Sequence, residues 1–163
     1  MIRLLDRAVG TIAAAAAAVA GVLTLVMAVL VGYGVVMRYV LGQPQNWTDE
    51  LVGYLTVAAV MLAAADVLRR REHIAVDVLT ERLGAPARRW SEMLGLVAVA
   101  TFCALLIAGG WEMMAFSHMI GMRSTGTLAM PMWIPQAFVP GGAALLGLAA
   151  LARLARLLAA GRE

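Results

Sequence analysis

Residues with side chains suited to chemistry are sparse in this chain, and the most notable group is Trp47 with Asp49 and Glu50. The two carboxylates come at the start of an apolar segment, where they suit the positive end of a helix dipole. Asn46 or Thr48 is expected to cap that helix. Because Glu50 lies one turn into the helix, contact with another subunit is an alternative role for it.

A second candidate is Glu112, which lies near the end of another apolar segment. A carboxylate within a membrane span is a functional candidate by default. Glu112 would lie close to the membrane interface, where that argument is weaker. It is expected to pair with Arg38 or Arg123, or to face a partner.

The remaining reactive side chains predict no catalytic or metal site. His73 and His118 are expected at opposite membrane faces, so they cannot bind one metal ion, and no pair of histidines lies where it would ligate a haem. Cys103 is the only cysteine and lies in an apolar run. It is therefore interpreted as a small packed residue. The sequence predicts that the protein is not an enzyme and has no cofactor.

The segments that must position these residues are apolar throughout. The chain of 163 residues is 63% hydrophobic, with a mean hydropathy of +0.86. The first uncharged run is too long for a cleaved signal peptide and is read as a retained anchor. Helices satisfy their backbone hydrogen bonds in lipid, whereas open strands do not. We therefore expect an all-α integral membrane protein forming a single membrane domain (1–163), with spans at about 8–37, 47–68, 91–114 and 133–158.

Arginine placement predicts the orientation. The 13 basic residues are all arginine. They cluster at both chain ends and between the second and third spans, and only Arg38 and Arg123 lie in the other two loops. The positive-inside rule then places both termini and the central loop in the cytoplasm. This clustering at segment ends also argues against nucleic-acid binding.

The central loop is predicted to contain a short amphipathic helix over 73–84. Its apolar and polar side chains fall on opposite arcs at 100° per residue, and His73 can pair with Asp77 at i+4. The segment is too short and too polar to span a bilayer. It is expected to lie on the cytoplasmic membrane surface, in contact with membrane lipids or with a partner subunit.

The fourth span is preceded and opened by prolines. Pro131 lies before it, Pro135 is tolerable in a first helical turn, and Pro140 is expected to kink the helix. Gly141 and Gly142 permit close helix packing.

The charge inventory disfavours an autonomous pump. No acidic residue lies at mid-bilayer in spans one, three or four, and the first span lacks the central Glu expected of a small multidrug exporter. A scaffold subunit is therefore favoured. An autonomous small membrane carrier and a haem-anchoring redox subunit remain as alternatives.

Three stretches carry a family resemblance: "RYVLGQPQNWTDEL" (38–51), "HIAVDVL" (73–79) and "TLAMPMWIPQAFVPGG" (127–142). In this order, on a four-span chain, they resemble the small membrane (DctQ-like) subunit of TRAP transporters. The resembling elements are an Arg–aromatic pair, a Trp before an acidic pair, a His-Ile-x-Val-Asp stretch and a Pro-rich entry to the last span.

The resemblance implies a role in the bacterial inner membrane. Such transporters import small organic anions of the C4-dicarboxylate, keto-acid or sialic-acid type. A periplasmic solute-binding protein captures the solute, and a large DctM-like membrane subunit moves it with Na⁺. The small subunit resembles a fixed scaffold, so Na⁺ coupling is expected in the large subunit. The partner-interface candidates in the resembling stretches are Arg38, Trp47, Asp49, Glu50, His73, Asp77, Pro131 and Pro135. Arg123, which lies between those stretches, is a separate candidate for docking on the outer side.

Overall fold

The computed structural model describes residues 2–70 and 85–159, and this part of the chain consists of four long helices. They are α1 (Ile2–Tyr39), α2 (Asn46–Arg70), α4 (Ala85–Met119) and α5 (Trp133–Ala159). Within the described residues β-structure is limited to one isolated bridge between Arg123 and Pro131. The predicted surface helix at 73–84 lies outside the described residues.

All four helices are long and apolar enough to cross a membrane. At 1.5 Å per residue, even the 25 residues of α2 reach about 38 Å, more than the roughly 30 Å of a bilayer core. Helix α4 has 35 residues and extends beyond the predicted 91–114 span at both ends. For the residues that the structure describes, the expectation of an all-helical fold with four candidate spans is confirmed.

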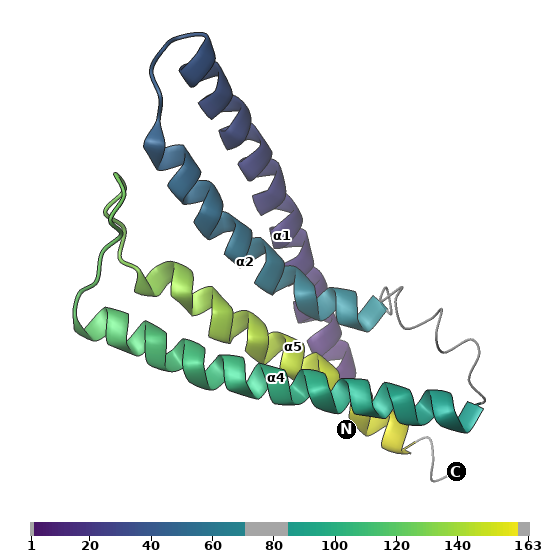
Figure 1. Cartoon of the computed structure of the whole chain (residues 1–163). Helices are drawn as coiled ribbons and strands as arrows, with labels where there is room; N and C mark the ends of the chain where they lie inside the picture. The colour runs from purple at the N-terminus through teal and green to yellow at the C-terminus, as the bar shows by residue number, and fades with distance from the viewer. Residues whose placement is uncertain (1, 71–84, 160–163) are drawn as a thin grey trace.

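The helices form two hairpins that converge at one end and diverge at the other (Figure 1). One hairpin is α1 with α2, and the other is α4 with α5; α2 and, to a lesser extent, α1 pack against α5. The closed end contains the start of α1, the end of α2, the start of α4 and the end of α5. The open end contains the opposite helix ends, with the loops 40–45 and 120–132.

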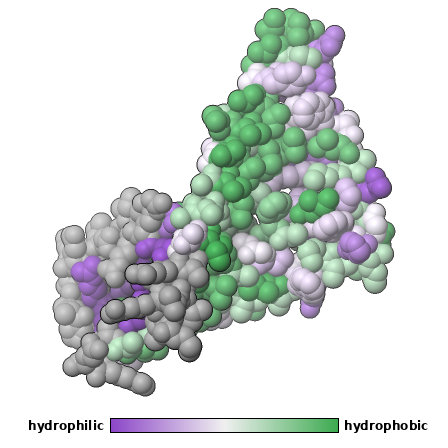
Figure 2. Space-filling view, turned by 180° about the vertical axis from the view of Figure 1, so that it is seen from behind, coloured by the Kyte–Doolittle hydropathy of each residue, from purple (hydrophilic) through white to green (hydrophobic). Residues whose placement is uncertain are grey.

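A small core lies toward the closed end and takes residues from every helix. Its buried members are mostly alanines, which allow helix axes to approach closely. The flanks, in contrast, expose large apolar side chains: Leu25 of α1 and Leu105 of α4 are each 67% exposed. Figure 2 shows hydrophobic residues gathered along the arm formed by α1 and α2. The buried core residues are Ala13, Ala65, Leu68, Leu96, Ala149 and Ala150.

Helix α5 crosses its neighbours at glycines. A Cβ atom added to Gly142 would lie 2.5 Å from Met61 Cβ and 2.7 Å from the Met61 carbonyl oxygen of α2. A Cβ atom on Gly110 of α4 would lie 3.0 Å from Pro140 Cδ. Gly141 has open space around it. Of the predicted pair, Gly142 is therefore the glycine that permits close packing.

Candidate functional site

The 120–132 loop is folded into a hairpin by backbone bonds. Helix α4 ends at Met119, and Gly121 follows with a φ of 63°, a left-handed conformation that glycine adopts without strain. The Met122 N–H then donates to the Ser117 carbonyl at 2.9 Å, and the Gly121 N–H donates to the His118 carbonyl at 3.2 Å, as in a Schellman motif. This ending turns the chain back across the open end.

Two further bonds close the loop. The Ser124 N–H donates to the Met130 carbonyl at 2.8 Å, and the Met132 N–H donates to the Met122 carbonyl at 3.0 Å. The tip of the loop therefore has a defined shape, although it carries no regular strand.

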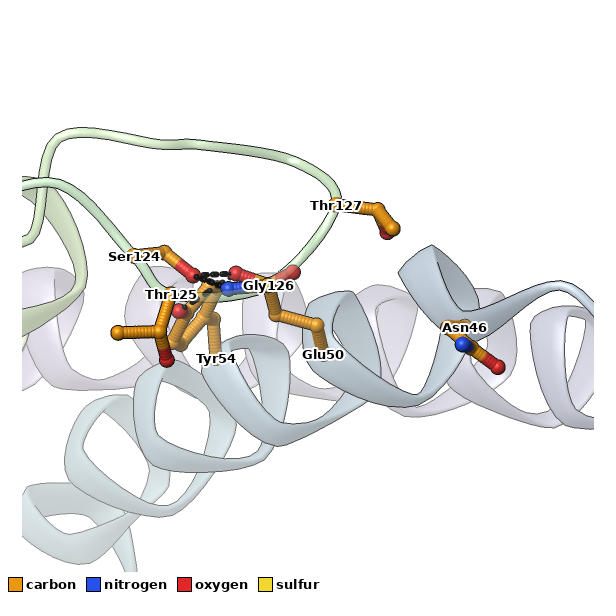
Figure 3. A pocket seen from close by; sticks show the side chains of 7 residues that line it. All are labelled: Asn46, Glu50, Tyr54, Ser124, Thr125, Gly126 and Thr127. Carbon is orange, nitrogen blue, oxygen red and sulfur yellow. Dashed lines mark hydrogen bonds between the residues drawn. The ribbon is translucent and has the colours of Figure 1, made fainter.

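Glu50 of α2 accepts hydrogen bonds from this loop through both carboxylate oxygens, and its contact with Ser124 is drawn in Figure 3. The Ser124 hydroxyl donates to Oε1, and the Leu128 N–H donates to Oε2 at 3.3 Å. Tyr54, one turn further along α2, donates its hydroxyl to Oε1 at 2.9 Å. The carboxylate thus joins α2 to the loop between α4 and α5.

An open cleft of about 490 Å³ lies beside Glu50. Its lining is polar and mostly hydroxylic, and Glu50 is the charged group in it (Figure 3). A carboxylate disfavours an anionic ligand by charge repulsion. The lining residues are Asn46, Glu50, Tyr54, Ser124, Thr125, Gly126 and Thr127.

The neighbouring acid, Asp49, has a different partner. It forms an ion pair with Arg38 at 3.1 Å, and the two side chains are 75% and 47% exposed. Trp47 donates its indole N–H to Gln45 Oε1 at 3.1 Å, and its ring centroid lies 6.2 Å from that of Tyr33. These three predicted interface residues are therefore held within the α1–α2 hairpin.

The expected helix cap is not found. Helix α2 begins at Asn46, so Asn46 and Thr48 lie inside it, and the Thr48 hydroxyl donates to the Gln45 carbonyl at 2.6 Å. The expected pairing of Glu112 with Arg38 or Arg123 is also wrong. Arg38 pairs with Asp49, while Arg123 donates to the Ala129 carbonyl at 3.4 Å. The reason is proximity, because Asp49 lies on the helix paired with that of Arg38.

The other interface candidates are spread over the chain. Pro131 lies in the loop, opposite Arg123, and Pro135 is buried in the first turn of α5. His73 and Asp77 lie outside the described residues. The structure therefore brings together Arg38 with Asp49, and Glu50 with the loop that contains Arg123 and Pro131. The interface roles of these residues stay predictions.

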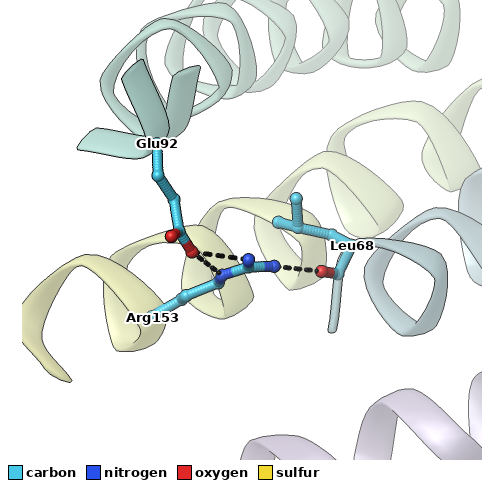
Figure 4. A network of polar contacts seen from close by, with 3 residues as sticks. All are labelled: Leu68, Glu92 and Arg153. Carbon is cyan, nitrogen blue, oxygen red and sulfur yellow. Dashed lines mark hydrogen bonds and ion pairs between the residues drawn. The ribbon is translucent and has the colours of Figure 1, made fainter. Parts of the chain in front are cut away.

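A second polar network lies at the closed end (Figure 4). Arg153 of α5 donates to Glu92 of α4 at 2.9 and 2.5 Å, and to the Leu68 carbonyl of α2 at 2.8 Å. Arg89 donates to the Leu157 carbonyl at 2.6 Å. Both carbonyls belong to the last turns of helices, where the ladder leaves them unpaired and the dipole favours cations.

Sequence reasoning missed these networks for different reasons. Tyr54 lies four residues after Glu50, so that contact could have been found from helical spacing. Glu92 and Arg153 have opposite charges and lie at the same end of neighbouring spans, which was a usable signal. Nothing in the sequence connects Ser124 or Leu128 to Glu50.

Within residues 2–70 and 85–159 no three His, Cys, Asp or Glu residues lie close enough together to hold a metal ion. Cys103 is buried, and a Cβ atom on Gly147 of α5 would lie 3.3 Å from its Cβ. Its side chain thus packs at a helix contact.

The four apolar helices, with charges at their two ends, define a multi-pass membrane protein. A sequence profile of the family described as "Tripartite ATP-independent periplasmic transporters, DctQ component" matches residues 27–160. The chain belongs to this family, so it is a transporter component of the inner membrane and not an enzyme.

A curated relative supports the same assignment. The chain is 36% identical over 101 residues to the "C4-dicarboxylate TRAP transporter small permease protein DctQ" of Rhodobacter capsulatus. The match covers 61% of this chain and 44% of that relative, which is less than half of its length. The resemblance drawn from the three sequence stretches is therefore confirmed.

Proposed function

We propose that this protein is the scaffold subunit of a binding-protein-dependent, Na⁺-coupled TRAP transporter that imports small organic anions. It would brace the static part of a large DctM-like membrane subunit while the transport part of that subunit moves. A periplasmic solute-binding protein would deliver the solute. Na⁺ would be bound by the large subunit.

One observation carries this proposal: the helices have charged side chains only toward their ends. In α1 no acidic or basic residue lies between Val9 and Met37, and in α4 none lies between Met93 and Trp111. A carrier of charged solutes needs polar groups at mid-membrane. These apolar flanks are suited to contact lipid or another apolar protein surface.

The solute class comes from the relative, whose name specifies C4-dicarboxylates. The open-end cleft is a poor site for such an anion because its charged group is Glu50. Solute selectivity is therefore assigned to the partner chains. C4-dicarboxylates, keto acids and sialic acids all stay within the proposed class.

We further propose that the closed end faces the cytoplasm. The arginines that predicted the orientation include Arg69, Arg89 and Arg153, and the fold gathers them at the closed end. Labelling with a membrane-impermeant maleimide tests this orientation in intact cells. A cysteine replacing Gln43 at the open end should react from outside, and one replacing Arg88 should react only after lysis; the reverse pattern would contradict it.

The scaffold role is tested by comparing the chain alone with the full transporter. The tagged chain should co-purify with a large DctM-like subunit, and uptake should fail when the chain is deleted. Liposomes containing only this chain should show no Na⁺-driven succinate flux. Flux with the chain alone would favour an autonomous carrier, and a bound haem spectrum would favour a redox anchor.

Single substitutions then test the interface candidates. Trp47→Ala removes an aromatic side chain at the open end and should lower the yield of complex with the large subunit. Glu50→Ala should lower it as well, through loss of a contact of its carboxylate with the large subunit. Normal assembly and uptake by both variants would remove them from the interface.

A further inference from the structure

We propose that Glu50 is a positioning residue that clasps the two helical hairpins together at the open end. Its carboxylate is carried by α2, while Ser124 and the Leu128 N–H that bind it belong to the loop between α4 and α5. The contact therefore crosses from one hairpin to the other, at the end where the helices diverge (Figure 1). It sets the separation of the hairpins there.

Two other contacts at this end, one polar and one aromatic, stay within one hairpin. Arg38 pairs with Asp49 inside the α1–α2 hairpin. His118 and Trp133, with ring centroids 5.5 Å apart, join α4 to α5. Beside Glu50, Tyr54 also crosses between hairpins, since its hydroxyl lies 3.6 Å from Met132 Sδ. The cross-hairpin contacts are thus concentrated on one short stretch of α2.

The loop is shaped to receive the carboxylate. The Gly126 N–H donates to Ser124 Oγ at 3.1 Å, which orients the hydroxyl that donates to Glu50. Gly126 itself presents no side chain to the carboxylate, and a Cβ atom there would collide with Glu50. Among the described residues, positive φ values occur at Gly42, Gly121 and Ala129, and not at Gly126. Gly126 is therefore required by the contact and not by its backbone conformation.

The inference goes beyond the proposed scaffold role and does not depend on it. A fixed opening between the hairpins is a property of this chain alone. It can be measured whether or not the chain braces a larger subunit.

The test is a distance measurement across the open end in the full-length chain, reconstituted in nanodiscs. Nitroxide labels replace Leu41 in one hairpin and Ile120 in the other, which are 57% and 51% exposed. Cys103 is replaced by alanine. Pulsed electron–electron double resonance then gives the distribution of distances between the two nitroxide labels.

Glu50→Ala should lengthen and broaden that distribution, and Gly126→Ala should do so as well. Gly126→Ala should add nothing in the Glu50→Ala background, because the collision requires the carboxylate. Asp49→Asn is the matched control, since the adjacent acid acts within one hairpin, and it should leave the distribution unchanged. Glu50→Gln keeps the length of the side chain but replaces one of the two carboxylate oxygens with an NH₂ group, so one loop donor loses its acceptor. It should therefore shift the distance distribution less than Glu50→Ala does.

An unchanged distribution in Glu50→Ala would overturn the clasp. The clasp would also be overturned if Gly126→Ala changed the distribution equally in the parent chain and in the Glu50→Ala variant. The yield of complex with the large subunit, measured on the same variants, separates the two proposals. A shifted distance with normal complex yield would support the clasp and count against a partner-interface role of Glu50.

Discussion

The closed and open ends of the helical frame are held by different means. At the closed end, apolar residues from all four described helices form the core, and arginines cap the carbonyl ends of α2 and α5. At the open end, the hairpins are linked through a loop that reaches Glu50.

This difference implies that the two ends of the frame are restrained to different degrees. At the closed end, an arginine side chain of one helix donates to a carbonyl in the last turn of another helix, where the helix itself provides no donor. The position of the helix end is therefore restrained directly. A loop contact restrains the hairpins only through the loop's own stiffness. The predictions below test this contrast, and thermal unfolding in detergent micelles is the common measurement.

The largest effect is expected at the crossing between the two ends. Gly142→Ala places a methyl group against the Met61 backbone and should lower the free energy of unfolding by about 3 kcal/mol, since overpacking a helix contact forces the backbone to shift. Gly141→Ala is its matched control, with open space around the added methyl group. Equal melting temperatures for the two variants would show that α2 and α5 are not in close contact.

Next in size is the closed-end network. Arg153→Ala leaves the Leu68 carbonyl without this donor and removes the guanidinium from Glu92, for an expected loss of about 2 kcal/mol. Arg153→Lys keeps the charge but not the planar set of donors, so it should lose less. If both variants melted like the parent, the closed end would owe its stability to the apolar core alone.

A smaller loss is expected inside the α4–α5 hairpin. Gly110→Ala brings a methyl group to 3.0 Å from Pro140 Cδ, and the two helices must separate by a few tenths of an ångström to relieve this contact, at a cost of about 1 kcal/mol. Gly109→Ala meets no atom within 4 Å and serves as the control. A lower melting temperature for the control than for Gly110→Ala would contradict the assigned contact.

The smallest effect is expected for the exposed pair at the open end. Asp49→Asn removes the ion pair with Arg38, and exposed pairs contribute about 0–1 kcal/mol. The melting temperature should change little, and 1 M NaCl should remove the remaining difference by screening. A loss comparable to that of Arg153→Ala would mean that the two ends are equally restrained.

Much of the fold was predictable from local features. Spans were located because uncharged runs such as 8–37 bury well in hydrocarbon whatever their neighbours are. The expected glycine packing was confirmed at Gly142 but not at Gly141. The sequence places both glycines on the same helix. Only the crossing of α2 and α5 shows that Gly142, and not Gly141, lies on the face of α5 that contacts Met61.

The candidate site was predicted less completely. Trp47, Asp49 and Glu50 were selected together, yet Asp49 bonds within its own hairpin and Glu50 bonds across to the other. The pairing expected for Glu112 was wrong because charge and approximate depth do not specify which helix faces which.

The sequence by itself determined that this chain is helical, crosses a membrane and carries its charges near the helix ends, because transfer of each side chain into lipid depends mainly on that side chain. It also carried the family resemblance. The tertiary structure decided which polar groups meet. Arg153 reaches Leu68, and Glu50 reaches Ser124, only because α2 and α5 cross at Gly142 with a particular angle and register.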